Sequence, residues 1–250
     1  KLLGSLGDSF CQHLRPILAT FALIDSTDFE AYVSMEDGFL EDDPTNFLYF
    51  SDTREQVPML IDPYFYHSKG YAKFSAIKQL TWRERTAALV WRGASTGAAQ
   101  LNTTDEMCVT DHRLRQRIRL AMLSKDHANC DIKIYKVVQS ANESLDTSRL
   151  KDHDLIGSWV DEMDMSHFQF GLDIDGNTNS WSQFLKLAKL GCCIFKVESP
   201  RGHKQWYTNE FEAMQHYIPI KADLSDFEER LDWAFTNPNT CELIAREANR

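Results

Sequence analysis

The sequence predicts an α/β fold, and three observations lead to this prediction. From Trp82 onward, the chain follows a rhythm of strand, glycine turn, helix and strand, which is typical of α/β sheets. The apolar runs at residues 87–91 and 192–197 predict buried strands. The chain has 250 residues, of which 43% are hydrophobic, and it can therefore enclose a sizeable core.

Charge and cysteine content exclude several classes of protein. A formal net charge of -10 and a pI near 5.3 argue against a nucleic-acid partner, so any phosphate binding must be local. The six cysteines show no CxxC pairing, which favours reduced thiols and a cytoplasmic protein. No apolar run approaches the roughly 18 residues that span a bilayer. The abrupt start at Lys1 suggests a fragment, from which a signal or anchor could have been removed.

The N-terminal third differs in composition from the rest of the chain. An acidic loop at residues 36–44 precedes a strand-like segment at residues 47–50, and a segment rich in proline and tyrosine follows. The α/β rhythm begins only after a boundary near Ala76 to Arg85. We therefore expect an N-terminal lobe at residues 1–80 and a C-terminal lobe at residues 81–250.

The stretch VWRGASTG at residues 90–97 is the first candidate site. It follows the predicted strand at residues 87–91, and Gly93 and Gly97 would let the backbone turn tightly and approach a ligand closely. Arg92 offers a planar fork that matches phosphate oxygens, and Ser95 and Thr96 add hydroxyl donors. A structural turn with a buried, paired arginine explains the pattern equally well.

A helix is predicted at residues 111–125, capped by Thr110 or Asp111. Its apolar positions recur at helical spacing. Its other positions include Arg113, Arg115, Arg117 and Arg119. For most of these arginines we expect a solvated basic face, while one could point toward a ligand beside Arg92.

The segment FGLDIDGN at residues 170–177 predicts a strand that runs into a turn. Asp173 and Asp175 could hold a divalent cation bound to a nucleotide diphosphate. They could equally mark the end of the strand, with Asn179 or Ser180 capping the next helix. We favour the structural role for the pair, with a direct ligand contact nearby.

Two further helices complete the C-terminal part. One is predicted at residues 180–190, stopped by Gly191 and followed by the strand at residues 192–197. The other begins at a capping box formed by Ser225 and Glu228, and Asn237-Pro238 ends it.

Five segments together resemble glycosyltransferase family 90 in order and spacing. They are VWRGASTG from Val90, LDIDGNTNSWSQF from Leu172, GCCIFKV from Gly191, QWY from Gln205 and HYIPIKADLSDFEERL from His216. The family contains bacterial lipopolysaccharide and capsule glycosyltransferases and eukaryotic protein O-glucosyltransferases. The resemblance covers roughly Asn46 to the end of the chain.

The resemblance implies a GT-B-like fold with two Rossmann-type lobes and a donor cleft between them. It implies an acceptor-side lobe at residues 1–80 and a lobe that binds the nucleotide sugar at residues 81–250. It also implies a UDP-sugar donor and inversion at the anomeric carbon, with no cofactor and no obligatory metal. The donor residues it implies are Arg92, Gly93, Ser95, Thr96, Gly97, Asp175, Gly176, Ser180 and Gln183.

The family's catalytic aspartate lies at the end of a strand in the first lobe, and Asp52 occupies the matching place. Asp62 is its rival, although that residue could simply brace the turn at Pro63. The chain departs from the family at Gln183, where an arginine is common, and Lys186 or one of the helix arginines could compensate. It also has His167-Phe168 where the family often has Lys-Tyr.

The acceptor expected from these features is a glycan or lipid-linked glycan of a lipopolysaccharide or capsule. The enzyme would work in the cytoplasm, in peripheral contact with the inner face of the membrane; a protein acceptor is the alternative. Tyr64, Phe65, Tyr66 and Tyr71 could form a sugar-stacking wall or an inter-lobe core. Two competing functions are a metal-dependent transferase that uses Asp173 and Asp175, and a catalytically silent protein that binds carbohydrate or nucleotide.

Overall fold

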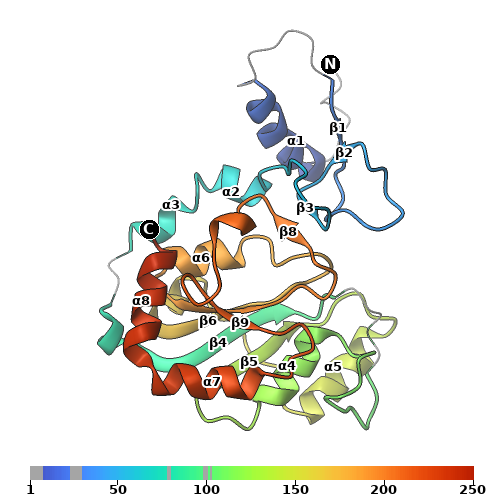
Figure 1. Cartoon of the computed structure of the whole chain (residues 1–250). Coiled ribbons are helices and arrows are strands. Elements are labelled where there is room, and N and C mark those ends of the chain that lie inside the picture. Colours follow the sequence, from blue (N-terminus) through green and yellow to red (C-terminus); the bar gives the residue numbers. More distant parts are fainter. Residues whose placement is uncertain (1–7, 23–29, 78–79, 98–100, 102) are drawn as a thin grey trace.

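The structure, a computed structural model, describes residues 8–22, 30–77, 80–97, 101 and 103–250. Its centre is a five-stranded sheet in which all neighbouring strands are parallel (Figure 1). In spatial order the strands are β5 (Cys130–Lys136), β4 (Thr86–Ala94), β6 (Phe168–Asp173), β7 (Cys193–Val197) and β9 (Ile218–Ile220). The predicted α/β fold is therefore confirmed, and the predicted strands at residues 87–91 and 192–197 lie within β4 and β7.

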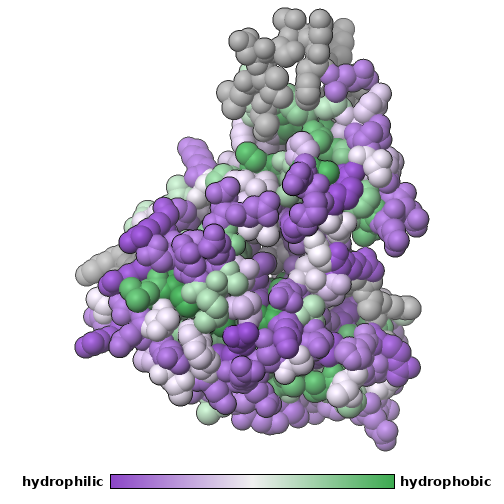
Figure 2. Space-filling view, in the orientation of Figure 1, coloured by the Kyte–Doolittle hydropathy of each residue, from purple (hydrophilic) through white to green (hydrophobic). Residues whose placement is uncertain are grey.

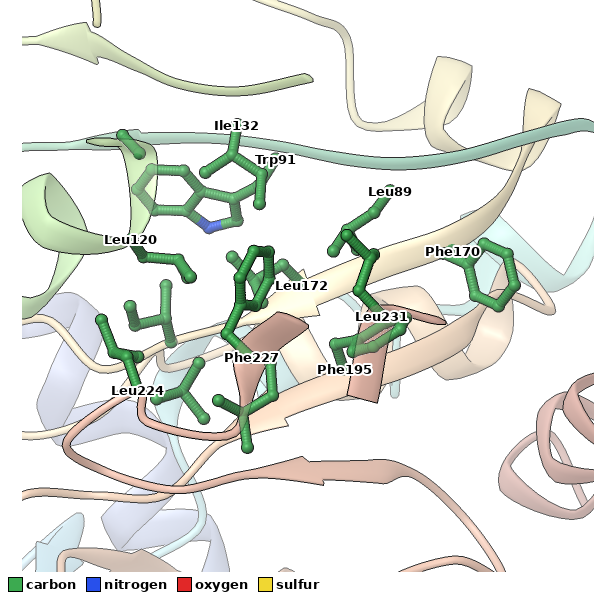
Figure 3. Close-up of a cluster of buried hydrophobic side chains, with 14 of the residues drawn as sticks. Leu89, Trp91, Leu120, Ile132, Phe170, Leu172, Phe195, Leu224, Phe227 and Leu231 are labelled. Carbon is green, nitrogen blue, oxygen red and sulfur yellow. The ribbon is translucent and has the colours of Figure 1, made fainter. Parts of the chain in front are cut away.

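Helices cover both faces of this sheet. On one face, α4 (Gln116–Ser124), α5 (Glu143–Asp152) and α7 (Phe227–Thr236) pack on alternate residues of the strands, such as Leu89 and Trp91 of β4. Figure 3 shows this cluster, in which Leu120 and Phe227 approach the sheet. On the other face, α6 (Gln183–Lys189) packs on the intervening residues, and α8 (Pro238–Ala248) contacts β7 and α6. Burial on both faces agrees with the burial of nearly every residue of β6 and β7.

The sheet has a topological switch point between β4 and β6. The chain passes from β4 outward to β5, whereas from β6 it passes in the opposite direction to β7 and β9. Ligands of such sheets bind in the crevice at the carboxyl ends of the two strands where the direction reverses. A register shift between Gly93 and Ala94 bends β4 at this place.

The N-terminal part contains the helices α1 (Asp8–Phe21), α2 (Pro63–His67) and α3 (Ala72–Ser75) and three two-residue strands. Strands β1 (Tyr32–Val33) and β2 (Phe47–Leu48) pair in parallel, so the predicted strand at residues 47–50 is shorter than expected. Strand β3 (Ser51–Asp52) pairs with β8 (Lys204–Gln205), which comes from the C-terminal part (Figure 1). The described residues of this part form no second Rossmann-type sheet, so the GT-B arrangement and the division at residue 80 stay predictions.

Trp181 joins the N-terminal part to the sheet. Its ring lies 5.8 Å from Phe50 and 5.7 Å from Tyr64, measured between ring centroids. Its backbone adopts a φ of 58°, in the left-handed region that bulky residues rarely occupy. The strain indicates that this contact, beside the start of α6, is held in place by the surrounding packing.

Three helix starts differ from the sequence prediction. Helix α4 begins at Gln116, not near Asp111, because Asp111 accepts hydrogen bonds from the backbone N and Nε of Arg113 and closes a turn there. Helix α6 begins at Gln183, and neither Asn179 nor Ser180 caps it. The predicted capping box at Ser225 is absent, since α7 begins at Phe227 and its N-cap makes no side-chain cap bond.

Other predictions for the C-terminal part are confirmed. Gly191 has a φ of 71° directly after α6, as a C-terminal stop requires. Asn237 ends α7, and Pro238 is the first residue of helix α8. The remaining elements are the 3-10 helices Trp82–Glu84, Met163–His167 and Thr208–Glu210.

The cysteines whose side chains the structure describes form no disulfide. Cys108, Cys130, Cys192, Cys193 and Cys241 are free thiols, while the side chain of Cys11 lies outside the described part. No helix within the described ranges is long and apolar enough to cross a membrane. The face of the molecule in Figure 2 is mostly hydrophilic, with hydrophobic residues in small separate groups. The cavities at the edge of the sheet are therefore stronger candidates for a functional site than this surface.

Candidate functional site at the carboxyl edge of the sheet

Two adjoining cavities open at the switch point between β4 and β6. The first, which we call the edge cleft, has a volume of about 440 Å³ and is lined by the ends of both strands, the start of α6, Trp159 and Glu162. The second, the adjoining pocket, has a volume of about 330 Å³ and is lined by residues 199–203 after β7 and by the start of α4. The two cavities share Thr96, Gly176 and Asn177.

The structure brings most of the predicted donor residues together around these cavities. Those that line the edge cleft are Arg92, Gly93, Thr96, Gly176, Ser180 and Gln183. Gly97 and Asp175 line the adjoining pocket, and Ser95 lines neither. The segments around residues 92 and 176 are far apart in the sequence, and the parallel pairing of β4 with β6 places them side by side.

Arg92 is a fixed charge in the wall of the edge cleft. Its Nε donates to the carbonyl of Ser158 at 2.8 Å, and its Nη1 to the carbonyls of Trp91 and Asp131. Its Nη2 lies 2.7 Å from Oδ2 of Asp131, and the side chain is only 9% exposed. These contacts match the alternative interpretation of a buried, paired arginine. Phosphate binding by Arg92 stays a prediction and would have to compete with Asp131.

Arg117 is the arginine of residues 113–119 that reaches this edge, a choice that the sequence analysis left open. Its Nε donates to the carbonyl of Asp175 at 2.8 Å and its Nη2 to the carbonyl of Ile174 at 2.9 Å. Its Nη1 donates to the carbonyl of Ala94 and to Oγ1 of Thr96. Burial lowers the pKa of Arg117 to about 10, which still leaves it protonated at neutral pH. Arg117 therefore ties the ends of β4 and β6 together at the switch point.

The predicted solvated basic face is wrong for most of these four arginines, and Arg113 and Arg115 lie before the first residue of α4. Arg113 is exposed, whereas Arg115 and Arg119 are buried and Arg117 is partly buried. The signal was present in the spacing, because residues two apart on a helix point about 200° away from each other. Four arginines at alternate positions cannot share one solvent face.

The glycines and Ser95 serve the packing of this turn. A Cβ atom at Gly93 would lie 2.1 Å from the Trp91 ring, and one at Gly97 would lie 3.0 Å from Cγ of Arg115. Neither glycine has a positive φ. The Ser95 hydroxyl donates to the carbonyl of Val138 and accepts from its N–H. The space beside these two glycines, where a ligand was expected, is therefore filled by the side chains of Trp91 and Arg115.

The start of α6 contributes polar groups to the edge cleft. Gln183 lines the cleft, and Lys186 lies one turn further along the same helix. The Lys186 ammonium is paired with Glu162. It supplies a positive charge close to Gln183, where the family often has an arginine.

Asp173 has the structural role that the sequence analysis favoured. Its Oδ2 lies 2.7 Å from Nζ of Lys196, and its Oδ1 accepts from the hydroxyl of Ser180. Because Lys196 neutralises Asp173, this carboxylate is poorly disposed to bind a cation. No cluster of three acidic, histidine or cysteine residues suited to a metal ion occurs among the residues that the structure describes.

Asp175 is in a different situation. It is 8% exposed, and its Oδ2 has no hydrogen-bond partner in the described part of the chain. Burial raises its pKa from 3.8 to about 6, although Lys196 and the Ser199 hydroxyl limit the rise. At neutral pH this carboxylate is therefore mostly ionised. It lines the adjoining pocket, and one of its two oxygens lacks a hydrogen-bond donor in the described part of the chain.

The substitution Asp175→Asn is expected to stabilise the fold at pH 7. The pKa of Asp175 is about 6 in the folded protein and about 3.8 in the unfolded chain, so the folded state binds this proton more tightly. The free energy of unfolding therefore decreases as the pH rises from about 3.8 to about 6. Removing the buried charge should recover up to about 3 kcal/mol at pH 7 and little at pH 4. Urea denaturation of both proteins at the two pH values measures this difference. An equal effect at both values would contradict the assigned pKa.

Asp52, the predicted catalytic base, lies at the end of β3 and is fully buried. Its Oδ2 lies 2.6 Å from Nη2 of Arg54, and its Oδ1 accepts from Nε and the backbone N of the same arginine. It lines neither cavity. It pairs with Lys204 of β8, the residue that follows His203 of the adjoining pocket.

Asp62, the rival base, has the structural role considered for it. Its Oδ1 accepts from the backbone N of Phe65 at 2.8 Å and caps α2, which begins at Pro63. Its Oδ2 accepts from Nε1 of Trp206 at 3.3 Å. Burial raises the pKa of Asp62.

The aromatic side chains divide between core and cleft. Phe65 and Tyr71 pack in the core as the alternative predicted, whereas Tyr64 is exposed and lines the edge cleft. The sequence analysis missed Trp159, which is 56% exposed and lies 4.8 Å from the ring of Tyr135. Both rings line the edge cleft. A bulky aromatic residue in a loop directly after Gly157-Ser158 was the available signal.

Comparisons with known proteins agree with the resemblance seen in the sequence. Residues 70–250 match the sequence profile of "Glycosyl transferase family 90". The chain is 26% identical over 67% of its length to "Uncharacterized protein 035R" of Invertebrate iridescent virus 3, of which the match covers 15%.

A second relative has a name that describes an activity. The chain is 26% identical over 61% of its length to "Protein O-glucosyltransferase 3" of Rattus norvegicus, of which the match covers 28%. The chain therefore corresponds to well under half the length of these curated relatives. Because the family profile covers residues 70–250, most of the sequence, the chain belongs to glycosyl transferase family 90.

Proposed function

We propose that this protein is an inverting glycosyltransferase that moves a sugar from a UDP-sugar to a hydroxyl of a glycan acceptor. The observation that carries the proposal is the edge cleft at the switch point of a parallel sheet, in a chain of glycosyl transferase family 90. The N-terminal part would belong to the acceptor-side lobe of a GT-B arrangement.

The donor diphosphate would lie between Arg92 and the start of α6. Arg92 and Lys186 are both cations of the cleft wall, and each is paired with one carboxylate at present. A diphosphate carries enough negative charge to compete with Asp131 and Glu162 for them. Fixed donors of this kind stabilise the leaving UDP as its charge grows in the transition state.

The rings of Tyr135 and Trp159 would receive the uracil. They are exposed on the same cleft, and they present both a ring face and a ring edge because they meet at 73°. A planar base can stack on such a surface.

Asp52 would act as the general base. The acceptor hydroxyl would give its proton to the Asp52 carboxylate while its oxygen attacks the anomeric carbon. The bond from that carbon to the diphosphate oxygen breaks on the opposite side, and UDP leaves with the electron pair. One carboxylate is enough for inversion. The acceptor hydroxyl would have to replace a contact now made by Arg54.

Two kinds of acceptor are candidates. A lipopolysaccharide, capsule or lipid-linked glycan at the cytoplasmic face of the membrane is the first candidate. A protein hydroxyl is the second candidate, and the name of the rat relative favours it.

The metal-dependent and silent alternatives are separated by a turnover assay. UDP release from a panel of UDP-sugars, measured with and without a chelator, should proceed equally in both conditions. Loss of activity with the chelator would favour the metal-dependent transferase, although the Asp173 to Lys196 pair speaks against it. Binding of UDP without any turnover would identify a silent protein.

The substitution Arg92→Ala is expected to weaken UDP binding by about tenfold or more, because a charge-assisted hydrogen bond to phosphate is lost. Arg92→Lys should restore binding only in part, since an ammonium cannot reproduce the planar fork. Calorimetric titration with UDP, and with ADP and GDP as competitors for the same site, gives these affinities. Wild-type affinity in a folded Ala variant would make Arg92 purely structural.

A further inference from the structure

The adjoining pocket contains buried hydrogen-bond acceptors that have no donor. Oδ2 of Asp175 and Oε1 of Gln116 are both buried without a partner in the described part of the chain, and both residues line this pocket. The Nε2 group of Gln116 donates to the carbonyls of Ala222 at 2.8 Å and Glu198 at 3.4 Å. These contacts fix the amide and leave its oxygen as the atom without a partner.

His203 adds a third acceptor to the same pocket. Its Nε2 lies 3.0 Å from the carbonyl of Phe39. Burial lowers the pKa of His203, so the imidazole is neutral at pH 7. A carbonyl can only accept, so Nε2 carries the proton and Nδ1 is left as an acceptor.

The buried arginines of the pocket are engaged with the backbone. Arg115 donates to the carbonyls of Val138 and Gln139. Arg119 donates to the carbonyls of Val109 at 2.7 Å and Asp223 at 2.9 Å. These cations therefore shape the wall of the pocket, while the oxygens of Asp175 and Gln116 are the buried acceptors that lack a donor in the described part of the chain.

Buried acceptors without donors are costly, so a ligand that supplies hydroxyl groups would satisfy them. A phosphate would bring negative charge against the buried Asp175 carboxylate, and the donors of Arg115 and Arg119 already bond to backbone carbonyls. An ammonium group would meet the surrounding charges of Arg115, Arg119 and Arg201. The best match is an uncharged ring with several hydroxyls, and a volume of about 330 Å³ is of the size that small-molecule sites have.

We propose that the adjoining pocket binds the sugar ring of the UDP-sugar, with the ring hydroxyls donating to Asp175 and Gln116. The inference rests on the proposed function and adds the place of the transferred sugar. The pocket is continuous with the edge cleft through Thr96, Gly176 and Asn177, so one donor molecule can occupy both cavities.

The position of Asp52 supports this assignment independently. Asp52 pairs with Lys204, the residue after His203, and Ser51 beside it lies close to Thr178 of the pocket. The proximity is visible at Gly38, where a Cβ atom would lie 2.9 Å from Cβ of Ser51 and 3.1 Å from Cγ2 of Thr178. A general base for sugar transfer must be near the anomeric carbon, and this pocket is near Asp52.

The test compares two ligands, UDP and UDP-sugar, by calorimetry. The sugars are glucose, galactose, xylose and N-acetylglucosamine, and the one with the highest turnover is used. In Asp175→Asn and in Gln116→Met, the ratio of the UDP-sugar affinity to the UDP affinity should fall about tenfold, while the UDP affinity itself changes little. Asp232→Asn is the matched control, because this exposed carboxylate of α7 lines neither cavity and should leave the ratio unchanged.

Each other outcome overturns the inference. An unchanged ratio in both variants, with UDP still bound, would show that the sugar lies elsewhere while the proposed function stands. A raised KM for the acceptor with an unchanged ratio would assign the pocket to the acceptor. Failure of the wild-type protein to bind UDP at all would remove the proposed function and this inference with it. Thermal melts confirm that both variants are folded.

Discussion

The substitution Asp52→Asn is expected to lower the rate of sugar transfer about 10²–10⁴-fold, because the proton acceptor for the attacking hydroxyl is lost. The shape of the side chain is nearly unchanged, so the affinity for UDP should remain. Part of the network with Arg54 is lost, and we expect a modest decrease in the free energy of unfolding. Transfer rate and calorimetric UDP affinity, measured on the same preparation, separate the two effects.

Asp62→Asn is the control for this prediction. Asp62 caps α2, so its replacement should lower stability by about 1 kcal/mol and leave transfer largely intact. Near-normal transfer by Asp52→Asn, together with loss of transfer but intact binding in Asp62→Asn, would move the role of base to Asp62.

The substitution Arg117→Ala is expected to cause the largest loss of stability, about 3 kcal/mol or more. It leaves the carbonyls of Ala94, Ile174 and Asp175 without their donor and releases the ends of β4 and β6 from each other. UDP affinity should fall with it, because both cavities are built on these strand ends. Urea denaturation measures the stability, and calorimetry the affinity.

Arg113→Ala is the matched control, since Arg113 precedes the same helix and its side chain is 79% exposed. It should change stability by no more than about 0.5 kcal/mol. Equal effects of the two substitutions would show that Arg117 does not hold the strand ends together.

The central sheet was predictable because its signal is local. Continuous apolar runs marked β4 and β7, and Gly191 marked the end of α6. The N-terminal part gave no such signal, since two-residue strands have no periodicity. The pairing of Ser51 with Gln205 also joins residues that are far apart in the sequence, and no local pattern encodes it.

The candidate site was predictable only in part. The motifs placed Arg92, Thr96, Gly176 and Gln183 at one edge. They could not show what each side chain contacts, because the partners are backbone carbonyls of distant segments, as for Arg117. The motifs also could not show that the two aspartates differ. Asp173 forms an ion pair with Lys196, whereas one carboxylate oxygen of Asp175 has no hydrogen-bond partner in the described part of the chain.

The most direct test of the account is hydrogen exchange of the backbone amides with and without saturating UDP. The central claim is that UDP lies in the edge cleft at the switch point between β4 and β6. We expect UDP to slow exchange in peptides that cover residues 92–97, 156–162 and 174–183, and to leave the cavity near Thr81 and Arg246 unchanged. Protection around Thr81 and Arg246, with no change in the three segments of the edge cleft, would contradict the claim.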